Sequence, residues 1–149
     1  MKPIVLYSTK GGNTEKVAGE IASELNCPCI KITKDFDSST VNLNDFDLVF
    51  IGTGNYVAKP NADLLNFLKK MKLDSSKQFA LFMTWFGRGT SDKDTFNKVK
   101  AAVETQGQKM LVNCYKCFGE AHSMGTRVFS RLIGHNAQGH PNAEELFNI

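Results

Sequence analysis

Short apolar runs alternate with amphipathic segments along most of this chain, and this alternation limits the fold more than any other feature. The apolar runs, which we expect to form strands, are residues 4–7, 30–32, 47–53, 79–84 and 110–117. Apolar residues recur at helical spacing in segments 14–26, 64–71 and 91–107, whereas residues 33–46 are polar and irregular. Near-continuous apolar strands separated by amphipathic helices are typical of a parallel sheet covered on both faces. The pattern therefore predicts an α/β fold with a doubly wound, five-stranded parallel sheet in the order 2-1-3-4-5.

The length and composition of the chain are those of a single globular domain. Its 149 residues suit one domain spanning 1–149, with 42% hydrophobic and 22% charged residues. The apolar run near Met1 is too short for a signal peptide, and no apolar stretch is long enough to span a bilayer. We therefore expect a cytoplasmic protein without membrane insertion. The net charge of +3 is mild and the lysines are scattered, so nothing favours nucleic-acid binding, while a docking surface for an acidic partner stays open.

A loop rich in glycine and hydroxyl groups separates the first expected strand from the first expected helix. Its residues are Ser8, Thr9, Lys10, Gly11, Gly12, Asn13 and Thr14. Glycines let a backbone turn tightly with its N–H groups pointing inward, and a helix N-terminus adds unpaired N–H groups and a favourable dipole. Hydroxyl and amide side chains donate further hydrogen bonds, so the loop predicts a phosphate site built mainly from neutral donors. The alternative interpretation is a tight strand–helix turn in which Asn13 or Thr14 caps the helix.

Two further loops combine glycine with large aromatic residues where the expected strands 47–53 and 79–84 end. Their predicted contact residues are Thr53, Gly54, Asn55 and Tyr56, and Thr84, Trp85, Phe86, Gly87, Arg88 and Gly89. In the predicted topology, ligands bind beyond the carboxyl ends of the strands, between the first and third strands. A flat ring held between Tyr56 and Trp85 would bury aromatic surface that is costly to expose at loop tips. Together the three loops predict a mononucleotide with an aromatic ring system; the alternative is that these aromatics cap the sheet as core residues.

These three loops together resemble those of the short-chain flavodoxins. Residues 9–14 are similar to the phosphate loop of that family, except that Gly11 replaces a threonine and one hydroxyl donor is missing. Residues 52–56 resemble the loop that meets the flavin N5 edge, and residues 84–87 resemble the second loop beside the flavin. The resemblance covers all the expected strands and the closing segment 139–146, and it implies a single flavodoxin-like domain with tightly bound FMN. It further implies one-electron transfer between redox partner proteins, such as ferredoxin-type donors and acceptors, with no side chain acting as acid, base or nucleophile.

The chain departs from that family in its charge. Flavodoxins are usually acidic, whereas the loops at 53–60 and 84–91 contain no Asp or Glu and carry Lys59 and Arg88.

A second hypothesis is an enzyme, namely an FMN-dependent reductase or oxidase acting on a quinone, a porphyrinogen or a similar small molecule. A signalling receiver of the same topology is rejected, because Ser8, Thr9 and Thr53 stand where its aspartates should be.

The cysteines, the histidines and the last part of the chain suggest no additional chemistry. Residues three apart in a strand point to opposite faces, so Cys114 and Cys117 should diverge, and we expect all four cysteines, including Cys27 and Cys29, to be buried and apolar. The irregular spacing of His122, His135 and His140 does not favour a metal site.

An apolar stripe in the last part of the chain predicts a homodimer, because a twofold-related copy would cover it. The stripe consists of Val128, Phe129, Leu132 and Ile133.

Overall fold

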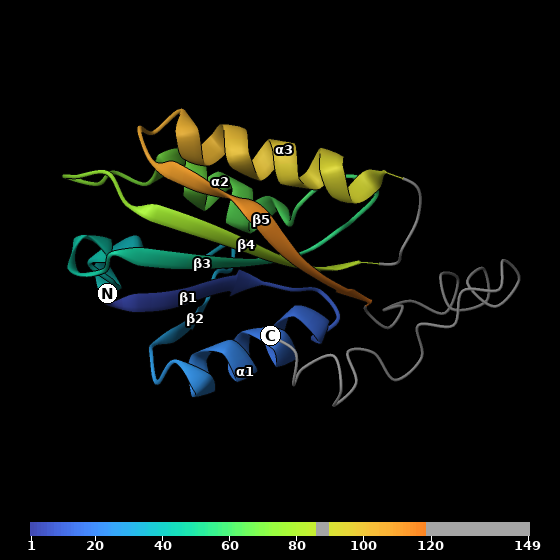
Figure 1. Ribbon diagram of the computed structural model, residues 1–149, viewed down its shortest axis with the longest axis horizontal. Coiled ribbons are helices and arrows are strands. Elements are labelled where there is room, and N and C mark those ends of the chain that lie inside the picture. Colours follow the sequence, from blue (N-terminus) through green and yellow to red (C-terminus); the bar gives the residue numbers. More distant parts are fainter. Residues whose placement is uncertain (86–89, 119–149) are drawn as a thin grey trace, which may run out of the picture.

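The computed structural model describes residues 1–85 and 90–118, with side chains up to residue 111. The strands are β1 (Pro3–Ser8), β2 (Cys29–Lys31), β3 (Leu48–Gly54), β4 (Gln78–Trp85) and β5 (Lys109–Phe118). The helices are α1 (Asn13–Glu24), α2 (Ala62–Lys70) and α3 (Ser91–Glu104). All five strands pair in parallel in the order β2-β1-β3-β4-β5 (Figure 1). The predicted fold class and strand order are confirmed.

Two apolar layers enclose the sheet, because successive side chains of a strand point to opposite faces. Ile4 and Leu6 of β1 pack in the same cluster as residues of α2 and α3, whereas Val5 and Tyr7 pack with α1. Figure 1 accordingly shows α1 on one face of the sheet and α2 and α3 on the other. The buried residues of α1 are Thr14, Val17, Ala18, Ile21 and Ala22. Among the helices that the structure describes, α1 is the one that covers the face of the sheet opposite to α2 and α3.

The strands pair in a register that brings three loops to one edge of the sheet. Ser8 at the end of β1 lies opposite Thr53 of β3, and Gly54 at the end of β3 lies opposite Thr84 of β4. The loops that follow these strands therefore start side by side. This edge is the switch point of the topology, because β2 and β3 pair on opposite sides of β1.

The polar segment between β2 and β3 forms two short 3-10 turns in place of a full helix, Ser38–Thr40 and Leu43–Asp45. The side chains of Asp37 and Asn42 cap these turns by accepting hydrogen bonds from backbone N–H groups. A groove of about 770 Å³ lies between this segment and α2. It is lined by residues 32–44 and by α2, and none of the predicted site residues lies in it.

The expectation that all cysteines are buried is wrong for Cys29. Cys27 is half-buried, but Cys29 is exposed at the start of β2, which is an edge strand. The Sγ atom of Cys29 still lies 3.6 Å from the carbonyl oxygen of Ala18. Partial burial raises the pKa of both thiols, and Cys27 and Glu15 raise that of Cys29 further, so both thiols stay protonated at neutral pH.

Several expectations fall outside the described part of the chain. They concern the side chains of Cys114 and Cys117, the three histidines, and the apolar stripe at 128–133 with the homodimer inferred from it. These stay predictions. Within the described residues, no helix combines the length and the apolar character needed to cross a membrane.

Gly52 in β3 occupies a position that only glycine fits. A Cβ atom there would lie 2.2 Å from the ring of Phe82 and 2.9 Å from the Cβ of Tyr7. We expect Gly52→Ala to lower the free energy of unfolding by about 1–3 kcal/mol through overpacking, measured by urea denaturation. Gly19→Ala in α1 is the control, because no atom lies within 4 Å of the added Cβ; it should raise stability by about 0.5–1 kcal/mol. Equal effects of the two substitutions would contradict this packing.

Candidate functional site

The loop between β1 and α1 is the predicted phosphate site, and we call residues 8–14 the phosphate loop. It turns at Gly12, whose φ of +85° is a left-handed conformation that glycine adopts without strain. Gly12 is also the N-cap of α1, and no side chain caps the helix. The alternative in which Asn13 or Thr14 caps the helix is therefore wrong, because both lie inside the first turn.

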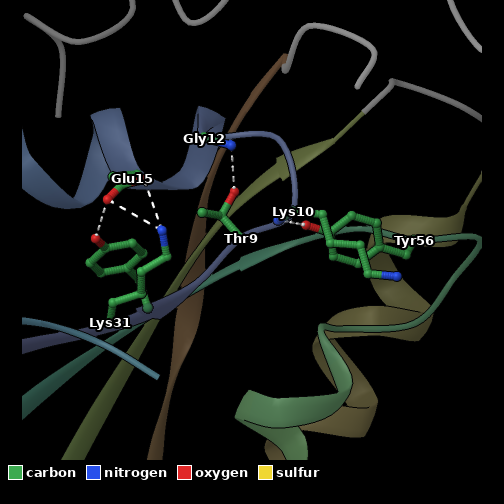
Figure 2. A network of polar contacts seen from close by, with 7 residues as sticks. Thr9, Lys10, Gly12, Glu15, Lys31 and Tyr56 are labelled. Carbon is green, nitrogen blue, oxygen red and sulfur yellow. Dashed lines mark hydrogen bonds and ion pairs between the residues drawn. The ribbon is translucent and has the colours of Figure 1, made fainter. Parts of the chain in front are cut away.

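Two backbone N–H groups of this loop point at hydroxyl oxygens. The N–H of Gly12 donates to Oγ1 of Thr9 at 3.0 Å, and the N–H of Lys10 donates to Oη of Tyr56 at 2.9 Å (Figure 2). Both N–H groups therefore have an oxygen acceptor within the protein, directly before the N-terminus of α1. An anion at this loop would replace these hydroxyl oxygens as acceptors or bind the N–H groups beside them.

The first turn of α1 is tied to the end of β4 through a pair of buried hydroxyl groups. Oγ1 of Thr14 lies 2.9 Å from Oγ1 of Thr84, and both side chains are buried. The phosphate loop and the loop after β4 were predicted to share one ligand. Their hydroxyls contact each other directly across the strand end.

The side chain of Asn55 holds the loop after β3 to α3. Its Nδ2 donates to Oγ of Ser91 at 2.9 Å, and its Oδ1 accepts hydrogen bonds from Oγ1 of Thr95 and from the N–H of Ala58. The backbone N–H of Asn55 donates to the carbonyl oxygen of Thr84 at 2.9 Å. The side chain of Asn55 therefore fixes the loop to α3, and its backbone N–H fixes the loop to β4.

The turn from Tyr56 to Lys59 contains two residues in the left-handed conformation. Val57 has a φ of +55° and Ala58 a φ of +60°, and the N–H of Tyr56 donates to the carbonyl oxygen of Lys59 at 2.8 Å. This conformation is unfavourable for a β-branched residue, and the side chain of Val57 is 94% exposed. The ammonium of Lys98 donates to the carbonyl oxygen of Ala58, so α3 also supports this turn.

The ring of Tyr56 lies against the phosphate loop (Figure 2). A Cβ atom on Gly54 would lie 2.5 Å from Oη of Tyr56, so this placement requires glycine at 54. The Nζ atom of Lys10 lies 4.8 Å from the centroid of the Tyr56 ring, within the range of a cation–π contact. The loop after β3 and the phosphate loop are thus one connected structure. The stacking of a ligand ring between Tyr56 and Trp85 stays a prediction.

A second polar network lies beside the phosphate loop, around Glu15 in the first turn of α1. Oη of Tyr7 donates to Oε1 of Glu15 at 2.7 Å, and Nζ of Lys31 lies 3.2 Å from Oε2 (Figure 2). The hydrogen bond from Tyr7, with a smaller contribution from Lys31, lowers the pKa of Glu15. Burial, followed by the contact with Glu15, raises the pKa of Tyr7 well above its usual range. Glu15 is therefore ionised at neutral pH.

The predicted site residues that the structure describes lie at the ends of β1, β3 and β4, in the loops after β1 and β3, and in the first turn of α1, all at this edge of the sheet. They are Ser8, Thr9, Lys10, Gly11, Gly12, Asn13, Thr14, Thr53, Gly54, Asn55, Tyr56, Thr84 and Trp85. The others, Phe86, Gly87, Arg88 and Gly89, lie outside the described residues, and their contacts stay predictions. A role in ligand binding also stays a prediction for each described residue.

A model of the flavodoxin domain family matches residues 4–149 of the chain. The chain belongs to this family. This flavodoxin-domain protein is 30% identical to an uncharacterized protein of Methanocaldococcus jannaschii over 148 residues, which cover 98% of this chain and 91% of that protein.

Solved structures of flavodoxins share the fold of this chain. Oxidised flavodoxin 1 from Bacillus cereus matches 99% of this chain and 98% of its own, with a TM-score of 0.64 and 16% identity. Fusobacterium nucleatum flavodoxin bound to flavin mononucleotide matches 81% of this chain and 79% of its own, with a TM-score of 0.59 and 20% identity.

Sequence reasoning missed the side chains that shape the loops. Ser91 and Thr95 contact Asn55 from 36 and 40 residues away, and no local pattern predicts contacts at such separations. The backbone N–H of Asn61 donates to Oγ1 of Thr53 at 2.8 Å, which joins the end of β3 to the start of α2. The Ser/Thr/Asn composition of the loops was the available signal, but it indicated ligand donors and not these internal bonds.

The hydroxyl pair of Thr14 and Thr84 provides a test of how the loops are joined. Removing one hydroxyl leaves the other buried without a partner, so Thr14→Val and Thr84→Val should each lower the free energy of unfolding by about 1–3 kcal/mol. The double variant should lose less than the sum of the two, because neither hydroxyl then remains unpaired. Urea denaturation of all four proteins measures this, and strictly additive losses would show that the two groups do not interact.

Proposed function

We propose that this flavodoxin-domain protein binds FMN at the carboxyl edge of its sheet and carries electrons one at a time between redox proteins. The observation that carries the proposal is the meeting of three strand ends at this edge: a loop rich in N–H and hydroxyl donors follows β1, Tyr56 follows β3, and Trp85 ends β4. A flavodoxin of the same fold is bound to flavin mononucleotide in its solved structure, which supports the same cofactor here.

The donors of the phosphate loop fit the phosphate group of FMN. The N–H groups of Lys10 and Gly12 bind the hydroxyl oxygens of Tyr56 and Thr9 at 2.9 and 3.0 Å, and phosphate oxygens would take the place of these acceptors. Thr9, Asn13 and the first turn of α1 would hold the phosphate, with Lys10 as the sole charged side chain of residues 8–14. Tyr56 and Trp85, at the ends of the neighbouring loops, would contact the ring system.

The described side chains at this edge favour an electron carrier over an enzyme. FMN supplies the redox chemistry when it is bound, and the protein needs only to hold it and adjust its potential. The hydroxyls of Thr14 and Thr84 pair with each other, and those of Thr53 and Thr9 contact backbone groups. Among the described residues of the site, none of these four hydroxyls is shown in contact with a side chain that could act as a general base, which a nucleophile would need. We propose ferredoxin-type donors and acceptors in the cytoplasm as its partners, as its membership of the flavodoxin domain family suggests.

Flavin titration tests the cofactor assignment. We expect one FMN per chain and, for Asn13→Ala, binding weaker by about 1–3 kcal/mol because a hydrogen bond to the phosphate is lost. The measurement is quenching of FMN fluorescence as protein is added. Asn66→Ala, at an exposed position of α2, is the control and should bind FMN like the wild type. Wild-type affinity in Asn13→Ala would exclude this residue from the phosphate site, and failure of the wild type to bind FMN would refute the cofactor assignment.

Electron exchange tests the role of the protein. Photoreduced, FMN-loaded protein should be reoxidised rapidly in stopped-flow experiments by a ferredoxin-dependent oxidoreductase. NADPH-driven reduction of a quinone by the isolated protein should be slow, because its partners are expected to be redox proteins. The enzyme hypothesis is correct instead if a quinone or porphyrinogen is turned over quickly while no redox protein exchanges electrons with it.

A further inference from the structure

The phosphate loop has an acidic neighbour. Glu15 is the acidic residue of the first turn of α1, one residue after the loop. A carboxylate at a helix N-terminus competes with a bound anion for the same favourable dipole, and it repels a dianionic phosphate. A loop that accepts such a phosphate therefore has to keep this carboxylate away from the ligand or cancel its charge.

Two residues of adjacent strands hold the Glu15 carboxylate. Tyr7 of β1 and Lys31 of β2 are direct partners in the parallel register, so their side chains lie next to each other under the start of α1. Both oxygens of the carboxylate are engaged, Oε1 by the Tyr7 hydroxyl at 2.7 Å and Oε2 by the Lys31 ammonium at 3.2 Å. Figure 2 shows Glu15 with Lys31 on one side of the Gly12–Thr9 contact, and Lys10 with Tyr56 on the other.

We propose that Lys31, together with Tyr7, is a positioning residue for the phosphate site: it neutralises the Glu15 carboxylate and turns it aside, so that the adjoining loop accepts a dianionic phosphate. The inference rests on the proposed binding of FMN. Lys31 does not belong to any of the three site loops, and its role is electrostatic.

The charges involved make the effect dependent on salt. The side chains of Lys31 and Glu15 are 43% and 48% exposed, so their fields are screened by ions in solution. The screening length is about 30 Å at 0.01 M salt and about 3 Å at 1 M salt. An effect of Lys31 on phosphate binding should therefore be large at low salt and nearly vanish at high salt.

The experiment compares FMN with riboflavin, which lacks the phosphate, in fluorescence titrations at about 0.01 M and about 1 M salt. The variants are Lys31→Met, Glu15→Gln and the double variant. Lys100→Met is the matched control, because Lys100 forms a similarly exposed ion pair with Glu104 in α3 at 3.9 Å. Riboflavin binding by the wild type provides the reference for effects that do not involve the phosphate.

At low salt, Lys31→Met should raise the Kd for FMN on the order of three- to tenfold and leave the Kd for riboflavin unchanged. The loss should disappear in the Glu15→Gln background, and Lys100→Met should behave like the wild type. Equal weakening of both flavins, an unchanged FMN affinity, or a loss that persists without Glu15 would each overturn the role of Lys31. A wild-type protein that binds neither flavin would instead overturn the proposed function itself.

Discussion

The parallel register of β1, β3 and β4 is the constraint on which the rest of the site depends. Ser8 pairs with Thr53 and Gly54 with Thr84, so the ends of three strands that are far apart in the sequence lie side by side. Each loop begins where its strand ends. The separate register of β1 with β2 determines the network beside the site, because it makes Tyr7 and Lys31 neighbours.

A close approach between neighbouring strands occurs in the middle of the sheet, where Gly52 of β3 is the register partner of Phe82 of β4. Gly52 leaves room for the ring of Phe82, which packs with Val5 and Tyr7 beneath α1. The loop after β3 is held by side chains of α3, with Asn55 bound by Ser91 and Thr95. A rigid scaffold with anchored loops is what a cofactor site needs, because the donors must keep their positions when the ligand binds.

The sequence predicted the elements of this fold but not the contacts within its loops. The strands could be predicted because both faces of a parallel sheet are buried, which produces continuous apolar runs such as residues 47–53. The exposure of Cys29 was missed because β2 is an edge strand, and its sequence does not show which of its side chains the neighbouring elements leave uncovered. The left-handed φ of Val57 opposes the preference of a β-branched residue, and the hydrogen bonds that hold this turn are made by its neighbours Tyr56 and Ala58. The pairing of Glu15 with Lys31 joins residues 16 apart on different elements, which no local spacing indicates.

In the proposed complex, the backbone of residues 10–14 binds the phosphate of FMN. Amide chemical shifts in ¹H–¹⁵N correlation spectra, recorded with FMN and with riboflavin, test this binding. Because a hydrogen bond to a phosphate moves an amide proton downfield, the N–H groups of Gly11, Gly12 and Asn13 should shift strongly downfield with FMN and much less with riboflavin. Shifts confined to the groove between residues 33–46 and α2, or identical shifts with both flavins, would contradict the account.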